Sequence, residues 1–223
     1  MSRPSTSMTE EEFYDPHPGR ALRLGDVLQG LPSLCHKVAT LTPDLGCDGY
    51  TIDIRHPTCS AVMSPCCSIQ DGVICVAPLV HVQGSFLDNP YLEQDLTRLN
   101  RPMFAEQAVT PGKWAKLSNA EKAERSGQGL AYAFNSFFVY APHRLLKPYV
   151  LKSNKGVEHT VRHYMVDVRG LYRIDCPAVQ RDSLTASAPK VLQLSAPARD
   201  DLRGKLSNYF ARVPEEDVPF LNR

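Results

Sequence analysis

Two apolar runs joined by a turn signal constrain the fold of this chain more than any other feature. The first run spans residues 59–64 and ends at Pro65, and the second spans residues 73–80 and is rich in β-branched side chains. Asp71-Gly72 precedes the second run, and apolar runs bounded by turn residues are typical of neighbouring strands. We therefore expect a central β-hairpin.

Strand-like runs continue in the second half of the chain. The runs that predict strands there are 137–140, 164–168, 171–174 and 191–194. A helix is expected after Ser195, which can cap it, and Pro214 should end it. One face of this helix carries four apolar residues, namely Leu202, Leu206, Tyr209 and Phe210. Because strands do not alternate regularly with helices, we do not expect a doubly wound parallel sheet. We expect an α+β fold built on a small, bent antiparallel barrel.

The first half of the chain is rich in loops outside the central hairpin. Proline and glycine recur between residues 30 and 57, which is typical of a long loop. Within it, residues 50–54 alternate between apolar and polar side chains, and this pattern fits a half-buried strand in a small hairpin.

We expect one folded domain, residues 21–223, after a disordered N-terminal tail at residues 1–20, which is rich in Ser, Thr, Glu and Pro. The least regular part, residues 82–128, is expected to be a helical insertion. Inside it, the stretch from Ser118 to Glu121 matches a capping box and predicts a short helix, and Trp114 is expected to anchor the insertion to the core.

Charge and cysteine content limit the function. The formal net charge is +1 and the pI is about 7.6, whereas proteins that coat nucleic acid through its phosphates usually carry a basic excess. No apolar run approaches the roughly 18 residues that a membrane-spanning helix needs. The N-terminus has no secretory signal and the seven cysteines are irregularly spaced, so we expect a cytoplasmic protein with reduced thiols.

Three segments resemble the MazF/PemK-like toxins, a family with an SH3-like barrel. Gly25-Asp26-Val27 is similar to the start of the family's first strand, and residues 55–57 and 60–64 are similar to its Arg-Pro pair and central strand. The segments 164–168 and 192–210 are similar to its last strands and final helix. The resemblance implies an SH3-like barrel with a helical insertion and a C-terminal helix, and self-association as a homodimer through the last strands.

The resemblance also implies a bacterial or phage setting, such as a toxin–antitoxin or antiphage defence system. The toxins cleave RNA with an arginine and with a threonine or serine on the second central strand. Arg55 can supply the arginine, but residues 77–80 contain no hydroxyl. Residues 64–69 also resemble a strand end found in a looser group of bacterial proteins, with Ser68 where an acidic residue is usual.

The first hypothesis is a non-catalytic module that binds a protein partner and needs no cofactor. Four polar or aromatic residues are its candidate contacts: His56, Ser68, Trp114 and Arg203. The second hypothesis is an endoribonuclease that cleaves single-stranded RNA, with Arg55 and a hydroxyl such as Ser64 or Ser68 in its site.

The third hypothesis is a zinc- or thiol-dependent protein. His56, Cys59, Cys66 and Cys67 offer the nitrogen and sulfur ligands that zinc prefers. Adjacent strand residues point to opposite faces, however, so Cys66 and Cys67 are poorly placed to bind one ion. As a functional thiol, Cys67 would need a neighbouring group that lowers its pKa, usually a histidine.

Two further polar patterns are expected to be solvated surfaces. His159 and His163 are spaced as on one face of a strand, and we expect them at an exposed edge. The final helix is expected to have a basic, solvated side, formed by Arg199, Arg203, Lys205 and Arg212.

Overall fold

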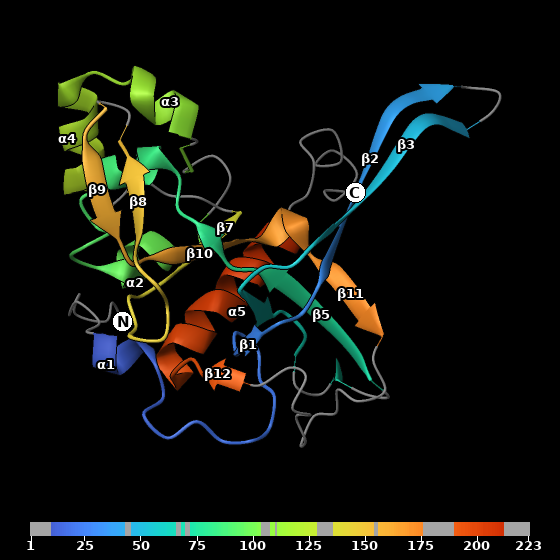
Figure 1. Ribbon diagram of the computed structural model, residues 1–223. Coiled ribbons are helices and arrows are strands. Elements are labelled where there is room, and N and C mark those ends of the chain that lie inside the picture. The colour runs from blue at the N-terminus through green and yellow to red at the C-terminus, as the bar shows by residue number, and fades with distance from the viewer. Residues whose placement is uncertain are drawn as a thin grey trace, which may run out of the picture. The chain divides into compact units, whose positions relative to one another are not determined.

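The computed structural model describes residues 10–42, 46–65, 68–69, 72–103, 108–109, 111–128, 136–153, 156–175 and 190–211 (Figure 1). The fold is α+β, as expected, and the pairings between its strands are antiparallel. The chain divides into two compact units. Unit 1 comprises residues 1–17, 81–169 and 194–223, and unit 2 comprises residues 18–80 and 170–193.

Unit 2 is built from strands. These are β1 (Val27–Gln29), β2 (Ser33–Thr42), β3 (Gly46–Arg55), β4 (Cys59–Val62), β5 (Val73–Pro78), β11 (Tyr172–Asp175) and β12 (Lys190–Leu192). Five of them form one sheet in the order β11-β5-β4-β1-β12, while β2 pairs with β3 in a separate ribbon. The central hairpin is confirmed, because β4 and β5 are antiparallel neighbours. No pairing among the described strands closes the five-stranded sheet into a barrel.

The core of unit 2 follows from the apolar runs. Ile74 and Val76 alternate along β5, and both are fully buried together with Val62 from β4 and Leu28 from β1. Gly25 has a φ of 82°, a left-handed conformation that favours glycine, so it permits the tight turn before β1. The Gly-Asp pair therefore lies in the turn before β1, and the side chain of Asp26 is buried.

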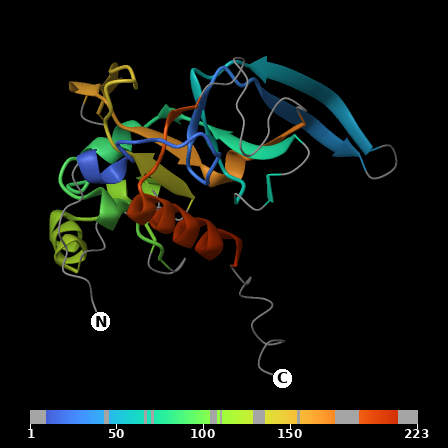
Figure 2. The same cartoon turned by 90° about the horizontal axis from the view of Figure 1, so that it is seen from below.

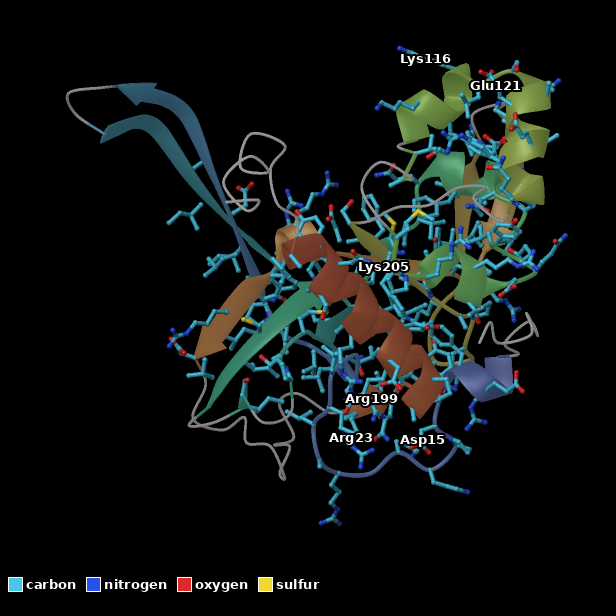
Figure 3. All side chains as sticks on the ribbon, turned by 180° about the vertical axis from the view of Figure 1, so that it is seen from behind. Asp15, Arg23, Lys116, Glu121, Arg199 and Lys205 are labelled. Carbon is cyan, nitrogen blue, oxygen red and sulfur yellow. The ribbon has the colours of Figure 1, made fainter. Side chains whose placement is uncertain are left out.

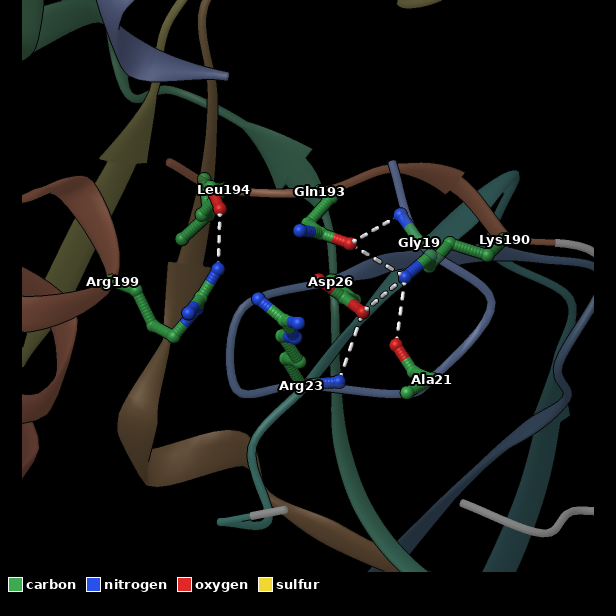
Figure 4. Close-up of polar contacts among 8 residues, drawn as sticks. All are labelled: Gly19, Ala21, Arg23, Asp26, Lys190, Gln193, Leu194 and Arg199. Carbon is green, nitrogen blue, oxygen red and sulfur yellow. Dashed lines mark hydrogen bonds and ion pairs between the residues drawn. The ribbon is translucent and has the colours of Figure 1, made fainter. Parts of the chain in front are cut away.

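Asp26 lies at the centre of a buried polar network in unit 2 (Figure 4). The ammonium group of Lys190 donates to the Oδ2 atom of Asp26 at 2.9 Å, to the carbonyl oxygen of Ala21 at 2.8 Å and to the Oε1 atom of Gln193 at 2.8 Å. The same Asp26 oxygen accepts from the backbone N–H of Arg23. A buried ammonium with three acceptors is well compensated, so this network joins the turn before β1 to β12.

Unit 1 combines helices with short sheets. Its elements are α1 (Glu10–Phe13), the 3-10 helix η2 (Gly84–Asp88), α2 (Leu96–Asn100), α3 (Pro111–Lys116), α4 (Asn119–Gly127), β7 (Phe137–Tyr140), β8 (Tyr149–Lys152), β9 (Glu158–Val161), β10 (Tyr164–Asp167) and α5 (Ala196–Phe210). The strand β6 (Val80–His81) spans the boundary of the units and joins β10 and β7 in a three-stranded sheet. The strands β8 and β9 form a hairpin. In the described part of the chain, no helix is both long and apolar enough to cross a membrane.

Phe13 and Tyr14 correct the expected N-terminal tail. Both side chains are buried in unit 1, where the ring of Phe13 lies 6.0 Å from that of Phe138. Tyr14 forms an isolated β-bridge with Leu194, and its hydroxyl donates to the carbonyl oxygen of Ala141 at 2.7 Å. The polar composition around these two aromatic residues gave no sign that they are buried.

The helix predictions are confirmed where a local cap specifies them. The capping box of Ser118 and Glu121 is present at the start of α4, and Ser195 caps α5 by accepting from the N–H of Ala198. The expected stop at Pro214 lies outside the described residues. The short helix α2 is also capped locally, because the side chain of Asp95 accepts from the N–H of Arg98.

Lys205 corrects the expected solvated side of α5 (Figure 3). Its side chain is 2% exposed, and its ammonium group donates to the carbonyl oxygen of Leu99 near the end of α2 at 3.1 Å. Burial lowers the pKa of Lys205 to about 7, and Asp201 opposes the shift. The long helix seen in Figure 2 therefore packs one of its charged residues inside unit 1.

Gly204 lets α5 approach the residues that follow α2. A Cβ atom at this position would lie 2.7 Å from the Cγ atom of Pro102, which is closer than real Cβ contacts. We expect Gly204→Ala to destabilise the protein by about 1–2 kcal/mol, because overpacking outweighs the roughly 1 kcal/mol that alanine adds in a helix. Thermal unfolding measures the change. Gly127→Ala in α4 is the matched control, since nothing lies within 4 Å of its Cβ position; an equal loss there would contradict the packing argument.

Candidate protein-binding surface

The strands β2 and β3 form a long two-stranded ribbon in unit 2. Its two ten-residue strands are paired from Ser33 and Arg55 at the base to Thr42 and Gly46 near the tip. Both ribbon views show it extending away from β5 of the five-stranded sheet in the same unit (Figures 1 and 2). An isolated two-stranded ribbon is marginally stable in water, so an extension of this length gains from a binding partner.

One face of the ribbon exposes large apolar side chains. Leu34 and Ile54 are directly opposite each other, and they are 60% and 65% exposed. Ile52 lies two residues from Ile54, hence on the same face, and it is 53% exposed. We call Leu34, Ile52 and Ile54 the apolar face of the ribbon. A contiguous exposed apolar surface of this kind marks an interaction site more often than scattered single residues do.

Near the base of the ribbon, the other face carries polar side chains. Ser33 is paired with Arg55, and Thr51 and Asp53 occupy the alternate positions along β3. Thr51 and Arg55 are exposed, and Asp53 is partly exposed. Near its base, where the side chains are described, the ribbon therefore has one apolar and one polar face.

The ribbon also offers backbone hydrogen-bonding groups. Among the described strands, β2 pairs only with β3 and β3 pairs only with β2. Each strand consequently presents one edge whose N–H and C=O groups have no strand partner in this part of the chain. Such an edge is a template for an added strand.

The candidate residues for RNA cleavage differ in exposure to solvent. Arg55 ends β3 and His56 follows it, and both are exposed. Ser64 is 7% exposed, and its hydroxyl oxygen accepts from the backbone N–H of Cys75 at 2.8 Å. Ser64 thus serves as a buried acceptor that holds β5 beside the end of β4.

The other proposed contact residues have different surroundings. Trp114 is 4% exposed in α3, which agrees with its expected anchoring role. Arg203 forms an ion pair with Asp200 on the exposed side of α5. Ser68 is exposed, and its backbone N–H donates to the carbonyl oxygen of Pro65. Trp114 and Arg203 belong to unit 1, whereas Ser68 belongs to unit 2.

The thiol hypothesis rests on residues that are only partly described. Cys59 is 7% exposed in β4, and burial raises the pKa of its thiol, which disfavours the reactive thiolate. Cys66 and Cys67 lie outside the described residues. Within the ranges that the structure describes, no group of three or more His, Cys, Asp or Glu side chains is placed to hold a metal ion.

Sequence reasoning identified the strand that carries the apolar face but not its exposure. The alternation at residues 50–54 predicted a half-buried strand, and β3 is present with that alternation. The missing information was the position of the core, because a period of two gives the same pattern whichever face is covered. The nearby prolines and glycines, which suggested a loop, were the signal that this strand lies outside the main sheet.

No family model matches the chain, and neither a curated protein nor a solved structure matches it.

Proposed function

We propose that this protein is a non-catalytic binding module, and that the β2–β3 ribbon binds a partner protein. The observation that carries the proposal is the apolar face, on which Leu34, Ile52 and Ile54 are each more than half exposed. Burying this surface against a partner would remove apolar area from water, which is the main favourable term in protein association. A partner would cover these exposed side chains.

The same ribbon supports a specific binding mode. A partner strand can add to the edge of β2 or β3, where main-chain hydrogen bonds would supply affinity. Side chains of the partner would then contact the apolar face, and alternate positions along the strand would supply specificity. A protein fits this surface better than a nucleic acid does, because the described residues of the apolar face carry no charge.

A binding role also agrees with the position of Ser64. Its hydroxyl is buried and already accepts a hydrogen bond, so it is poorly placed to attack RNA beside Arg55. The SH3-like barrel and the toxin–antitoxin or antiphage defence setting belong to the proposal as the implications of the resemblance.

Site-specific photo-crosslinking in the native host tests the proposal. We expect a photoreactive benzoylphenylalanine at position 34 or 54 to crosslink one host protein, because both positions lie on the apolar face. The same group in place of Thr51, which is exposed on the polar face, is the control and should not give that product. The crosslinked protein is then identified, purified and mixed with this protein to measure the dissociation constant.

Substitution of the apolar face completes the test. Ile52→Ser with Ile54→Ser should weaken binding to the purified partner at least tenfold, which corresponds to about 1.4 kcal/mol. The fold should survive, since both side chains are exposed, and circular dichroism would check it. Unchanged affinity, equal crosslinking from both faces, or crosslinking only to a second copy of this chain would each overturn the proposal.

A further inference from the structure

Residues 143–164 of unit 1 concentrate positive charge. This segment contains five of the chain's 25 Lys and Arg residues but only one of its 24 acidic residues, Glu158. Its formal charge is therefore +4, whereas the formal charge of the whole chain is +1. The near-neutral net charge of the chain is therefore compatible with a locally basic segment. Local charge decides whether a surface attracts an anion.

The fold brings the two ends of this segment together at the base of the β8–β9 hairpin. Tyr149 at the start of β8 is paired with Val161 at the end of β9. The hydroxyl of Tyr164 donates to the carbonyl oxygen of Lys147 at 2.7 Å, which fixes the residues before β8 beside the start of β10. Lys147 and Arg162 therefore flank the same end of the hairpin.

The cations at this base are exposed and available. Arg144, Lys147 and Arg162 are exposed, and none of them has a carboxylate within ion-pair distance among the residues described. Lys152 differs, because it pairs with Glu158 further along the hairpin at 3.3 Å. Arg144 lies three residues before Lys147, in the segment that leads into β8. We call Arg144, Lys147 and Arg162 the cationic base of the hairpin.

An aromatic platform lies at the same place. The imidazole of His81 stacks on the ring of Tyr149, with centroids 3.6 Å apart and an angle of 5° between the planes. His81 also contacts the ring of Tyr164 edge to face at 5.6 Å. Because His81 is exposed while one of its faces is covered by Tyr149, its outer face can receive another flat ring.

Hydrogen bonds of the Tyr149 hydroxyl fix the position of the ring on which His81 stacks. The hydroxyl of Tyr149 accepts from the N–H of Val82 at 2.9 Å and donates to the carbonyl oxygen of His163 at 2.5 Å. Burial raises the pKa of Tyr149 to about 12, so this donor stays protonated at neutral pH. His163 is itself 3% exposed, which corrects its expected place at a solvated edge, and its Nδ1 atom lies 3.5 Å from the carboxylate of Glu93. Tyr149 is thus a fixed support for His81.

We propose that the base of the β8–β9 hairpin binds single-stranded nucleic acid, with Arg144, Lys147 and Arg162 contacting phosphates and His81 stacking on an unpaired base. Proteins bind single strands by this combination of a basic surface with exposed flat side chains. The expectation that the near-neutral net charge disfavours nucleic-acid binding applies to coating of the whole protein, and this proposal concerns one patch. It goes beyond the protein-binding role of the ribbon, since its residues all belong to unit 1.

The aromatic platform favours nucleic acid over an acidic protein. An acidic peptide would satisfy the cations but would make no use of a ring stacked parallel on His81. The aromatic platform also favours a single strand over a duplex, because the bases of a duplex are stacked on one another and cannot stack on His81. Both alternatives are therefore tested as competitors.

Fluorescence anisotropy with labelled 20-nucleotide poly-U and poly-dT, at 50 to 200 mM salt, tests the proposal on the full-length protein. For about three phosphate contacts we expect the logarithm of the association constant to fall against the logarithm of the salt concentration with a slope near −2. The variant Arg144→Gln, Lys147→Gln, Arg162→Gln should bind at least tenfold more weakly at 50 mM salt. Its salt slope should approach zero.

Two controls separate the site from general electrostatics. Arg20→Gln, Arg23→Gln, Arg173→Gln changes the net charge equally at exposed positions of unit 2, and it should bind like the parent protein. His81→Ala should weaken binding about fivefold or more with little change in salt slope, whereas His81→Phe should restore it. Melting temperatures of all variants confirm that they fold.

Three results would overturn the proposal. They are no binding of either single strand at 50 mM salt, an equal loss of binding in the unit 2 control, and equal or better competition by a duplex or by poly-glutamate than by the unlabelled single strand.

Discussion

Lys190→Met is expected to lower the free energy of unfolding by about 3–5 kcal/mol, because it leaves the carboxylate of Asp26 buried without its counter-ion. Asp26 is fully buried and the side chain of Lys190 is 5% exposed, so water cannot replace the lost ammonium group. The substitution also removes the donor to the carbonyl oxygen of Ala21 and to Gln193. Urea unfolding of the purified protein at pH 7 measures the change.

The pair also predicts strong non-additivity. Asp26→Leu alone should destabilise the protein by a similar amount, because it leaves the buried ammonium group of Lys190 without its counter-ion. The double variant Asp26→Leu with Lys190→Met should recover much of the lost stability. Lys152→Met is the matched control: Lys152 and Glu158 form an ion pair but are 70% and 62% exposed. We expect its removal to cost less than about 1 kcal/mol. Additive effects of the two buried substitutions would contradict this account of the network.

The features that were predicted correctly are set by residues near one another in the sequence. The capping box at Ser118 and the cap at Ser195 each depend on a contact three residues away, and both helices begin as predicted. The central hairpin depends on two adjacent runs, and β4 and β5 pair accordingly. Short-range chemistry of this kind can be read from one sequence.

The features that sequence analysis missed depend on contacts between distant residues. Asp26 and Lys190 are 164 residues apart, and each alone suggests an exposed charge. The burial of Lys205 is equally hard to predict, because its hydrogen-bond acceptor is the carbonyl oxygen of Leu99, 106 residues away. Phe13 and Tyr14 stand in a polar stretch and reach a core made by later residues. No local pattern reports which distant element will cover a side chain.

The candidate surfaces show the same limit. Residues 50–54 predicted a strand, but the exposure of Ile52 and Ile54 follows from the absence of a covering layer among the residues described. The positive charge of residues 143–164 was present in the sequence. Its link to His81 required the fold, which stacks that ring on Tyr149 across 68 positions of the chain.

Lys205→Met is expected to make the protein more stable at neutral and acidic pH, with an advantage that fades as the pH rises. Burial lowers the pKa of Lys205 in the folded protein to about 7, against an ordinary value of 10.5. Between these two values the unfolded chain binds a proton that the folded chain does not, so the unfolding free energy of the parent protein rises with pH there. Below pH 7 both states are protonated, and the cost of burying the ammonium is present in full.

The size of the effect follows from two opposing contributions. A shift of one pKa unit corresponds to about 1.4 kcal/mol, so the buried ammonium costs several kcal/mol at low pH, while methionine forfeits about 1 kcal/mol for the hydrogen bond to Leu99. Asp201, the charged group that opposes the pKa shift, remains in both proteins. We therefore expect Lys205→Met to be more stable than the parent by about 2–3 kcal/mol at pH 6, and this difference to shrink progressively between pH 7 and 10.

Urea unfolding at pH 6, 7, 8, 9 and 10 measures the difference between the two proteins. Lys116→Met, which removes an exposed amine from α3, is the matched control and should leave the pH profile of the parent unchanged (Figure 3). A gain in stability that is constant from pH 6 to pH 10 would mean that methionine merely packs better than lysine. A loss of stability at pH 6 would mean that the bond from Lys205 to the end of α2 outweighs the cost of burying the charge, and either result would contradict the prediction.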